Sequence, residues 1–236
     1  MTSSLGTLLV SGADARPFLQ GQLSADIDAL TPAHTLLASC NSAQGRVQAV
    51  LLLTERADGI ALILPASLTE RIAARLRKYV LRSKVKIEES ATVTEVLEPA
   101  AYRERDWRLA GIRAGLPQVY PQTYESFVAQ MLNLDLLGGI AFEKGCYTGQ
   151  EIIARTHFRG AIKRRMFRFQ CASPPPVPGT RVLAGEQHAG DVVDAAETSD
   201  GCELLAVISL AQAEAELELE SNRGARLQQL LLPYSF

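Results

Sequence analysis

Apolar and polar residues follow a strand-like pattern in the first third of the chain. Strands are expected at residues 34–40, at VQAVLLL (residues 47–53) and at IALIL (residues 60–64), separated by the turns NSAQG and RADG. Three strands joined by such short turns predict an antiparallel meander. Two further strands are expected at KVKIEE (residues 84–89) and TVTEVLE (residues 92–98).

Helical spacing marks three other segments. The stretch TLLVSGADARPFLQGQLSADI predicts a strand and then a helix, with Ser11 as its N-cap and Gly21 as its stop signal. Residues 66–82 combine an apolar face with a basic outer face, which predicts an amphipathic helix. Residues 123–136 carry an apolar stripe and predict a second long helix.

The segment ASPPPVPGT, residues 172–180, is the clearest boundary, because prolines neither continue a helix nor join a central strand ladder. Short strand-like pieces separated by Gly and Asp follow it. The expected fold is therefore α+β: residues 1–171 form a larger region with antiparallel sheets and flanking helices, residues 172–180 a linker, and residues 181–236 a small β-barrel-like domain.

Composition restricts the class of protein. The chain has 236 residues, 47% of them hydrophobic, which is enough to bury a sizeable core. Its 24 Lys and Arg against 26 Asp and Glu give a formal charge of −2, which argues against a general binder of nucleic acid or of anionic membranes. No secretory leader or membrane-spanning run is recognised, so the cytoplasm is the expected location.

The cysteines and histidines do not indicate a metal centre. The four cysteines are widely spaced and form no C-x-x-C pair, and the three histidines have no carboxylates at ligand spacing. Each cysteine is therefore interpreted as a separate thiol: Cys40, Cys146, Cys171 and Cys202.

The stretch KGCYTGQE, residues 144–151, carries the strongest candidate chemistry. Thr148 and Glu151 have the spacing of a capping box, which predicts a helix beginning at Gly149. Cys146 then lies just before a helix start and close to Lys144, and both influences favour a thiolate. A small buried core residue beside a tight turn is the alternative, and the local sequence leaves both interpretations open.

Basic residues dominate the sequence after this motif. No acidic residue occurs from Ile152 to Gly185. This patch suits a carboxylate-rich or phosphate-bearing ligand, although an ordinary strand with solvated outward side chains explains it equally well. Without interleaved aromatic residues on an exposed face, an RNA-binding platform is not expected. The basic residues are Arg155, Arg159, Lys163, Arg164, Arg165, Arg168 and Arg181.

The run LNLDLLGGIAFEKGCYTGQEIIARTHFRGAIKRRM closely resembles the signature of the YgfZ family, folate-binding proteins related to the aminomethyltransferase (T-protein) of the glycine cleavage system. The segments SGADARPFLQGQLSADI, HTLLASCNSAQGRV, WRLAGIRAGLPQV and LPYSF are also similar to that family. The resemblance implies an aminomethyltransferase-like fold that binds tetrahydrofolate. It also implies an accessory role in making or repairing iron–sulfur clusters in client enzymes, including one that thiomethylates tRNA. Consistent with the charge balance, no direct nucleic-acid or membrane partner is expected.

The same resemblance implies which residues form the site. Cys146 matches the family's functional cysteine, and Trp107, the only tryptophan, matches a tryptophan that lines the folate site. An ordinary core indole is the alternative for Trp107. The motif and the basic residues after it complete the candidate folate-binding set: Lys144, Gly145, Tyr147, Thr148, Gly149, Gln150, Glu151, Arg155 and Arg159.

Two features depart from the family pattern, and a third differs from the related aminomethyltransferase. Leu5 stands at or beside the position of a second ligand-lining tryptophan, and only about twenty residues separate the KVKIEE strand from Trp107, so the middle subdomain is shortened. The stretch GRVQAVLLL has no Asp or Glu where the aminomethyltransferase has an acidic residue. Because a carboxylate would stabilise the developing positive charge, its absence favours folate binding over catalysis. A tetrahydrofolate-dependent aminomethyl or one-carbon transferase is the alternative, and a third is a chain that acts through protein contacts alone.

Overall fold

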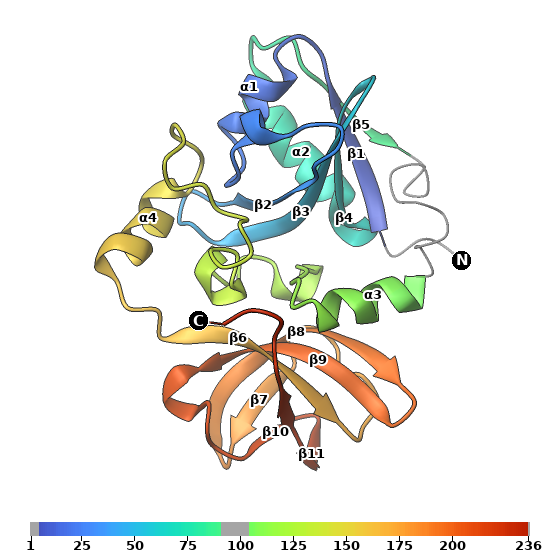
Figure 1. The fold of residues 1–236 in the computed structure, drawn as a ribbon, viewed down its shortest axis with the longest axis vertical. Coiled ribbons are helices and arrows are strands. Elements are labelled where there is room, and N and C mark those ends of the chain that lie inside the picture. Colours follow the sequence, from blue (N-terminus) through green and yellow to red (C-terminus); the bar gives the residue numbers. More distant parts are fainter. Residues whose placement is uncertain (1–4, 91–103, 236) are drawn as a thin grey trace.

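The computed structural model describes residues 5–90 and 104–235, which form two antiparallel sheets with helices above and between them (Figure 1). The first sheet has the strand order β2-β3-β4-β1-β5, in which β2, β3 and β4 form the expected meander. Its strands are β1 (Leu5–Ser11), β2 (Leu36–Asn41), β3 (Val47–Arg56), β4 (Gly59–Pro65) and β5 (Lys86–Ser90).

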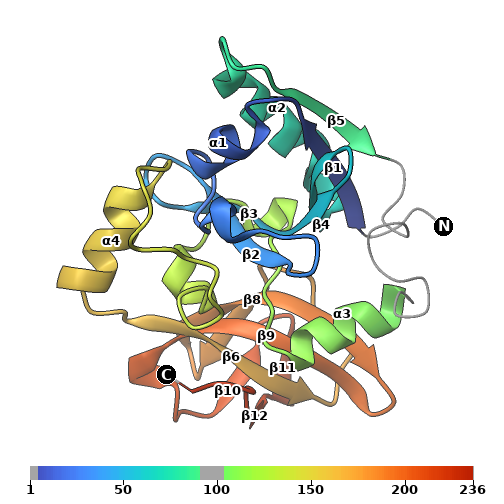
Figure 2. The ribbon, with the colours of Figure 1, turned by 45° about the horizontal axis from the view of Figure 1, so that its top comes forward.

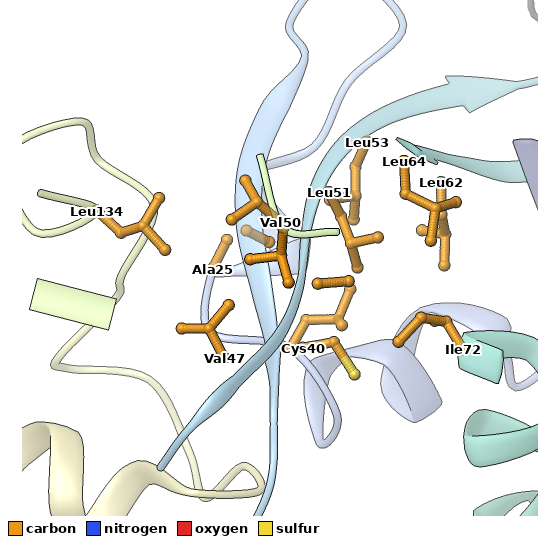
Figure 3. Packing of buried hydrophobic residues seen from close by; sticks show 14 of the residues in the cluster. Ala25, Cys40, Val47, Val50, Leu51, Leu53, Leu62, Leu64, Ile72 and Leu134 are labelled. Carbon is orange, nitrogen blue, oxygen red and sulfur yellow. The ribbon is translucent and has the colours of Figure 1, made fainter. Parts of the chain in front are cut away.

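One face of this sheet packs on helices α1 (Ala15–Gln20) and α2 (Thr69–Val80). The alternation of side chains along each strand directs a set of fully buried leucines toward these helices, and Ile72 of α2 meets them (Figure 3). The amphipathic pattern of residues 66–82 therefore predicts α2 correctly, with the short 3-10 helix η2 (Ala66–Leu68) leading into it.

The second sheet has the strand order β11-β10-β7-β8-β9-β6-β12 and curls into a half-barrel (Figure 1). Strand β6 precedes the proline-rich segment, so this sheet takes one strand from the N-terminal side of that segment. The strands are β6 (Arg164–Cys171), β7 (Arg181–Ala184), β8 (Gln187–Thr198), β9 (Gly201–Ser209), β10 (Leu217–Leu219), β11 (Asn222–Arg226) and β12 (Gln228–Leu230).

A middle layer separates the two sheets. Helix α3 (Glu104–Arg113) lies across β8 and β9, and the 3-10 helix η4 (Ala129–Leu132) contacts β6 and helix α4, which spans Gln150–Arg159 (Figure 1). The 3-10 helix η3 (Pro121–Thr123) comes between α3 and η4 along the chain. Helix α4 flanks this layer on the side away from α3, as Figure 2 also shows. Two more 3-10 turns complete the described fold: η1 (Ile27–Ala29) and η5 (Leu210–Gln212).

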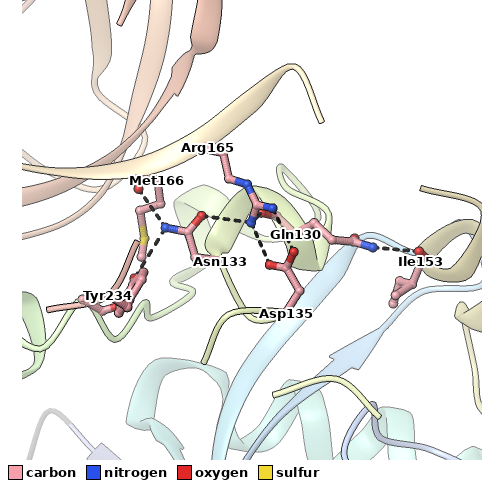
Figure 4. Close-up of polar contacts among 8 residues, drawn as sticks. Gln130, Asn133, Asp135, Ile153, Arg165, Met166 and Tyr234 are labelled. Atoms are coloured by element: carbon pink, nitrogen blue, oxygen red, sulfur yellow. Dashed lines mark hydrogen bonds and ion pairs between the residues drawn. The ribbon is translucent and has the colours of Figure 1, made fainter. Parts of the chain in front are cut away.

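A buried polar network joins the middle layer to the second sheet (Figure 4). Arg165 of β6 forms a bidentate ion pair with Asp135, with N–O distances of 2.7 and 2.9 Å, and also donates to the backbone carbonyl of Gln130. Asn133 donates to the carbonyl of Met166 in β6. The Arg165 and Asp135 side chains are only 10% and 9% exposed. Removal of either partner would therefore leave the other charge buried without compensation.

Mixed helices and antiparallel sheets confirm the α+β class, but three local predictions are wrong. Residues 123–136 form no long helix, because the backbone N–H of Val47 donates to Phe127 and that of Glu125 donates to Val47, so the segment follows β3. Helix α1 begins at Ala15 with Asp14 at its N-cap, since Ser11 ends β1, although Gly21 does terminate the helix. The capping box is also absent, as described below.

The strand expected at residues 92–98 lies outside the described residues. No helix within residues 5–90 and 104–235 has the length and apolar character needed to span a bilayer.

Candidate functional site

A largely apolar pocket of about 250 Å³ lies where the first sheet, α3 and β8 meet. Leu37 and Leu52 are direct cross-strand partners in β2 and β3, so their side chains share one face of the sheet and form one wall. Trp107 of α3 forms another wall and packs against the small cluster of Leu5 and Ile63. Trp107 is thus a partly buried pocket residue, and Leu5 lies in the same small cluster.

The polar part of this pocket is an ion pair between α3 and β8. Asp194 is 2% exposed and accepts hydrogen bonds from Arg108 Nε at 2.7 Å, Tyr120 Oη at 3.1 Å and the backbone N–H of Ala195 at 2.9 Å. Asp194 follows a register shift in the pairing of β8 with β9. A bulge of this kind redirects a side chain, and here the carboxylate lines the pocket although β8 is otherwise apolar nearby.

Burial is the largest single influence on the pKa values of Asp194, Arg108 and Tyr120. It raises the pKa of the Asp194 carboxyl, and the nearby Arg108 guanidinium and Tyr120 hydroxyl oppose that rise. Burial also acts to lower the pKa of Arg108, but Asp194 and Tyr120 together raise it above its ordinary value. Burial and the Asp194 charge raise the pKa of Tyr120, so its hydroxyl remains a hydrogen-bond donor.

Two further residues make the pocket suitable for a polar ring. Gln118 lines it, and its buried Oε1 has no hydrogen-bond partner in the described structure. An unsatisfied polar atom in a pocket wall is an expected contact for a hydrogen-bonding ligand. Gly111 also lines the pocket, and a Cβ added there would meet no atom within 4 Å, so the helix backbone is open to a ligand at this point.

The KGCYTGQE motif forms a loop on the other side of the molecule, and its backbone is fixed by Gly149. Gly149 has a left-handed φ of +84° and lies against Ser42 and Gly45, and an added Cβ would come within 2.5 Å of the Ser42 carbonyl oxygen. Helix α4 therefore begins at Gln150, with no side-chain cap. The predicted Thr148–Glu151 capping box is wrong because this left-handed turn occupies the N-cap, while the Thr148 N–H donates to the Gly21 carbonyl.

The side chain of Gln150 holds the loop from within. Its Oε1 accepts from the Tyr147 N–H at 3.4 Å and its Nε2 donates to the Lys144 carbonyl at 3.5 Å, so it spans Gly145 and Cys146. Lys144 Nζ donates to the carbonyls of Leu23 and Ala25 at 2.9 and 2.6 Å. Both ends of the loop are therefore anchored, and Cys146 projects from a fixed backbone.

In this loop Tyr147 is buried and Lys144 is half-buried. Burial lowers the pKa of Lys144 to about 8, although Asp26 and Asp28 oppose the shift. Burial raises the pKa of Tyr147 to about 12, its Oη has no hydrogen-bond partner among the described residues, and Lys144 Nζ lies 5.2 Å from its ring centroid. The Lys144 ammonium and the Tyr147 ring therefore pack against each other within the loop.

Cys146 is exposed, whereas Cys40, Cys171 and Cys202 are buried. Burial raises the pKa of the Cys40 and Cys202 thiols to about 11, which suppresses their thiolates at neutral pH. The core interpretation of Cys146 is therefore wrong on geometry: the side chain reaches solvent. Among the described residues, no group of three His, Cys, Asp or Glu side chains could hold a metal ion.

The basic patch is divided by the fold. Arg164, Arg165, Arg168 and Arg181 each pair with a carboxylate, namely Asp191, Asp135, Glu203 and Glu220. Arg155 and Arg159 are exposed on α4 together with Glu151 and the 69% exposed Phe158. Most of the patch thus consists of structural ion pairs.

The structure does not bring all the candidate residues together. Residues 144–151, Arg155 and Arg159 belong to the loop and to α4, and none of them lines the Trp107 pocket. Helices α3 and α4 lie on opposite sides of the molecule in both ribbon views. Arg108, Gln118 and Asp194 are pocket residues that were not predicted from the sequence. The single acid in the apolar run VVDAA is the one local signal, and it marks Asp194.

No protein-family model matches the chain. Its fold is that of an aminomethyltransferase of the glycine cleavage system: the structure of aminomethyltransferase T from Bartonella henselae superposes with a TM-score of 0.74, over 98% of this chain and 84% of that one. At 15% identity, this likeness shows the fold alone. The aminomethyltransferase-like fold expected from the sequence is confirmed.

Relatives in sequence show to which family the chain belongs. The tRNA-modifying protein YgfZ of Klebsiella pneumoniae is 31% identical over 84% of this chain and 81% of its own length. The protein of the same name from Edwardsiella ictaluri is 28% identical over 96% and 89%, and an uncharacterized protein of Haemophilus influenzae is 29% identical over 96% and 94%. The chain belongs to the YgfZ family.

Proposed function

We propose that this chain is a folate-binding accessory protein, related to tRNA modification, that supports the synthesis or repair of iron–sulfur clusters in client enzymes of the cytoplasm. The observation that carries this proposal is the exposed Cys146 on an anchored loop within a chain of the YgfZ family. Its relatives named tRNA-modifying protein support the connection to tRNA. The Trp107 pocket supports the folate half of the proposal.

The residues of the pocket fit a reduced folate. A flat bicyclic ring matches the space between Trp107 and the Leu37–Leu52 wall, and the Gln118 carboxamide and the Arg108 guanidinium are hydrogen-bonding groups for its polar edge. Gly111 leaves room for close approach of the ring. When bound, tetrahydrofolate supplies ring nitrogens that carry one-carbon units, and the protein residues bind and orient it.

Aminomethyl transfer has less support. Within the described residues, Asp194 is the one carboxylate that lines the pocket, and Arg108, Tyr120 and Ala195 already engage it. It is therefore poorly placed to stabilise charge that develops on a bound folate. The proposal that the chain binds folate without conventional transferase turnover is supported by this geometry and by the lack of acidic residues at positions 45–53.

A client protein would reach Cys146 from the side of α4. Phe142 stacks on His157 with ring centroids 3.9 Å apart, and Phe158 packs edge-on against His157. Lys144, at the base of the cysteine loop, lines a broad cavity of about 840 Å³ with these three rings. This cavity, lined by Lys144 two residues before the accessible thiol and by aromatic rings, suits a protein contact.

The test is complementation of a strain that lacks the native protein. Cys146→Ala is expected to fail to restore tRNA thiomethylation by the iron–sulfur client, while still binding tetrahydrofolate, because Cys146 is not part of the pocket. Gly145→Ala is the matched control, since an added Cβ there meets no atom within 4 Å. Full restoration by Cys146→Ala would refute the role of the thiol.

A further inference from the structure

Residues 71–87 carry positive charge without any acidic residue, and they cover most of α2, the turn after it and the start of β5. All 26 Asp and Glu lie elsewhere in the chain, so the formal charge of −2 conceals this segment. None of its residues lines the Trp107 pocket. The segment contains seven cations: Arg71, Arg75, Arg77, Lys78, Arg82, Lys84 and Lys86.

Three of these cations form a stripe along α2. Arg71, Arg75 and Lys78 follow the i, i+4, i+7 spacing that places side chains on one face of a helix. Ile72 and Leu76 lie on the face that packs into the core and are fully buried. The stripe therefore points to solvent, and the helix rise of 1.5 Å per residue spreads it over about 10 Å.

Uncharged groups hold the two arginines of this stripe. The guanidinium carbon of Arg71 lies 3.6 Å from the centroid of the Tyr124 ring. Arg75 donates to the Gln22 side chain at 3.0 Å and to the Asn41 carbonyl at 2.9 Å. These contacts orient the guanidinium groups, but they leave the positive charges in place.

Carboxylates compensate little of the charge of this segment. Among residues 5–90 and 104–235, the pair of Lys86 with Glu88, at 2.9 Å, is the one ion pair that the seven cations form. Asp14 accepts from the backbone N–H of Lys84. By contrast, the arginines at positions 164, 165, 168 and 181 each pair with a carboxylate. The exposed face of α2 is therefore a surface of uncompensated positive charge.

The stripe lies close to the cysteine loop. Asn41, whose carbonyl accepts from Arg75, also packs against Gly149, where an added Cβ would lie 3.1 Å from the Asn41 Cβ. One residue thus separates Arg75 from the glycine that fixes the loop of Cys146. A ligand that follows the stripe would therefore pass near this loop.

From these observations we infer that α2 and the turn after it bind the sugar–phosphate backbone of an RNA, with Arg71, Lys78 and Arg82 as phosphate contacts. All three side chains are exposed, and a row of uncompensated cations binds phosphates without reading sequence. The inference goes beyond the proposed function, in which no RNA contact is assigned to this chain. The expectation of no nucleic-acid partner rests on the net charge, which averages over this face.

An RNA suits this face better than an acidic protein or a membrane. Tyr79 and Leu81 are the large apolar side chains that residues 71–87 expose, and the apolar face of α2 is buried. A stable protein interface has an apolar core, and a helix on a membrane surface inserts its apolar face into the lipid. Binding to an RNA backbone needs mainly cations, and the 46% exposed Tyr79 ring adds a surface on which a base can stack.

The experiment measures the fluorescence anisotropy of a labelled, unmodified tRNA transcript as protein is added. Wild type is expected to bind it, with an affinity that falls steeply between about 50 and about 200 mM salt. The triple variant Arg71→Gln/Lys78→Gln/Arg82→Gln should bind at least about tenfold more weakly, and the slope of log affinity against log salt should be shallower by about three.

A second triple variant, Arg181→Gln/Arg223→Gln/Arg226→Gln, is the matched control. It removes the same charge from exposed arginines that already pair with carboxylates, so the affinity should change by less than about threefold. Glutamine has nearly the helix propensity of Lys and Arg, and both triple variants should therefore fold like wild type. Melting curves followed by circular dichroism check this point.

Three results would overturn the inference: no binding of the transcript by wild type, unchanged binding by the first triple variant, or equal weakening in both triple variants. Tighter binding of polyglutamate, or of vesicles of phosphatidylserine and phosphatidylcholine, than of the transcript would also overturn it, in favour of an acidic protein or an anionic membrane. Neither Cys146 nor the Trp107 pocket takes part in this assay. A negative result would therefore leave the proposed function intact, and failed complementation would leave RNA binding intact.

Discussion

Cys146 differs from the other three cysteines in its access to solvent. Cys40, Cys171 and Cys202 lie inside the packed sheets, and burial raises the pKa of Cys40 and Cys202 to about 11. The sequence alone could not separate a packed thiol from an exposed one, because the loop conformation depends on Gly149 fitting against Ser42. The exposure of Cys146 follows from tertiary contacts with the turn between β2 and β3.

The four thiols should therefore react very differently with an alkylating agent. Native protein treated with iodoacetamide at neutral pH is expected to gain one adduct, at Cys146, because alkylation needs access and a thiolate. The other three should react only after unfolding. Peptide mass spectrometry locates the adduct, and a first adduct on any buried cysteine would contradict this account of the loop.

Lys144 predicts a pH dependence of folding. Burial lowers its pKa to about 8 from an ordinary 10.5, so between these values the unfolded chain binds more protons than the folded chain, and stability rises with pH. Lys144→Met lacks this contribution. The unfolding free energy of wild type relative to Lys144→Met should thus increase by about 1 kcal/mol from pH 7.5 to pH 10, a value reduced for partial exposure.

Urea unfolding of both proteins at the two pH values measures this difference. Groups that titrate in both proteins change the two unfolding free energies equally. The difference between the two proteins therefore reports the titration of Lys144 alone. A difference that stays constant, or that moves in favour of the variant as the pH rises, would show that the lysine is not desolvated in the folded protein.

Helix α4 and the loop before it depend on one glycine. Gly149→Ala would force a side chain into a left-handed conformation and against the Ser42 carbonyl, so a loss of roughly 2 kcal/mol is expected. Gly145→Ala, four residues earlier in the same loop, meets open space and should change stability by less than about 0.5 kcal/mol. Thermal unfolding of both variants measures these two losses of stability. Equal losses in Gly149→Ala and Gly145→Ala would refute the described left-handed turn.

Regular elements followed the sequence pattern closely, and irregular ones did not. The meander β2–β4 and helix α2 were predictable because period-2 and period-3.6 patterns directly reflect one buried face. Residues 123–136 carry a helix-like stripe, yet Phe127 and Leu134 are buried in an irregular segment. Glu125 and Asn133 adopt left-handed backbone conformations there, and pairing with β3 replaces helical hydrogen bonds. Tertiary contacts overrode the local pattern.

The network around Arg165 connects the middle layer to β6, and we expect it to contribute strongly to the free energy of unfolding. Arg165→Met would leave Asp135 buried without its partner, at a cost of about 3–5 kcal/mol. Arg226→Met removes an exposed pair with Glu216 and should cost under about 0.5 kcal/mol. Urea denaturation of both variants is the measurement. A small effect at Arg165 would mean that the pair is solvated rather than buried.

At the level of the whole molecule, the pocket assembles residues that are far apart in the sequence. Leu37 and Leu52 come from the first sheet, Trp107 and Arg108 from α3, and Asp194 from the second sheet. The family resemblance pointed to Trp107, but spacing and periodicity could not place Asp194 beside it. The division of the chain at residues 172–180 stays a prediction, and β6 shows that the second sheet extends across that segment.

The pocket and the cysteine loop occupy separate parts of the molecule. Folate binding and the chemistry of Cys146 are expected to be separable by mutation, because no residue of the loop lines the pocket. A bound folate would influence Cys146 only through the layers between them. The proposal therefore depends first on whether this pocket takes a folate at all.

Calorimetric titration of tetrahydrofolate into wild type and Gly111→Leu tests that point most directly. A leucine at position 111 extends into open pocket space and improves helix propensity by up to about 1 kcal/mol, so the variant should fold at least as well as wild type. Wild type is expected to bind one tetrahydrofolate, and Gly111→Leu to lose binding while its melting temperature is unchanged or higher. No binding by wild type, or equal binding by both proteins, would contradict the assignment of this pocket to folate.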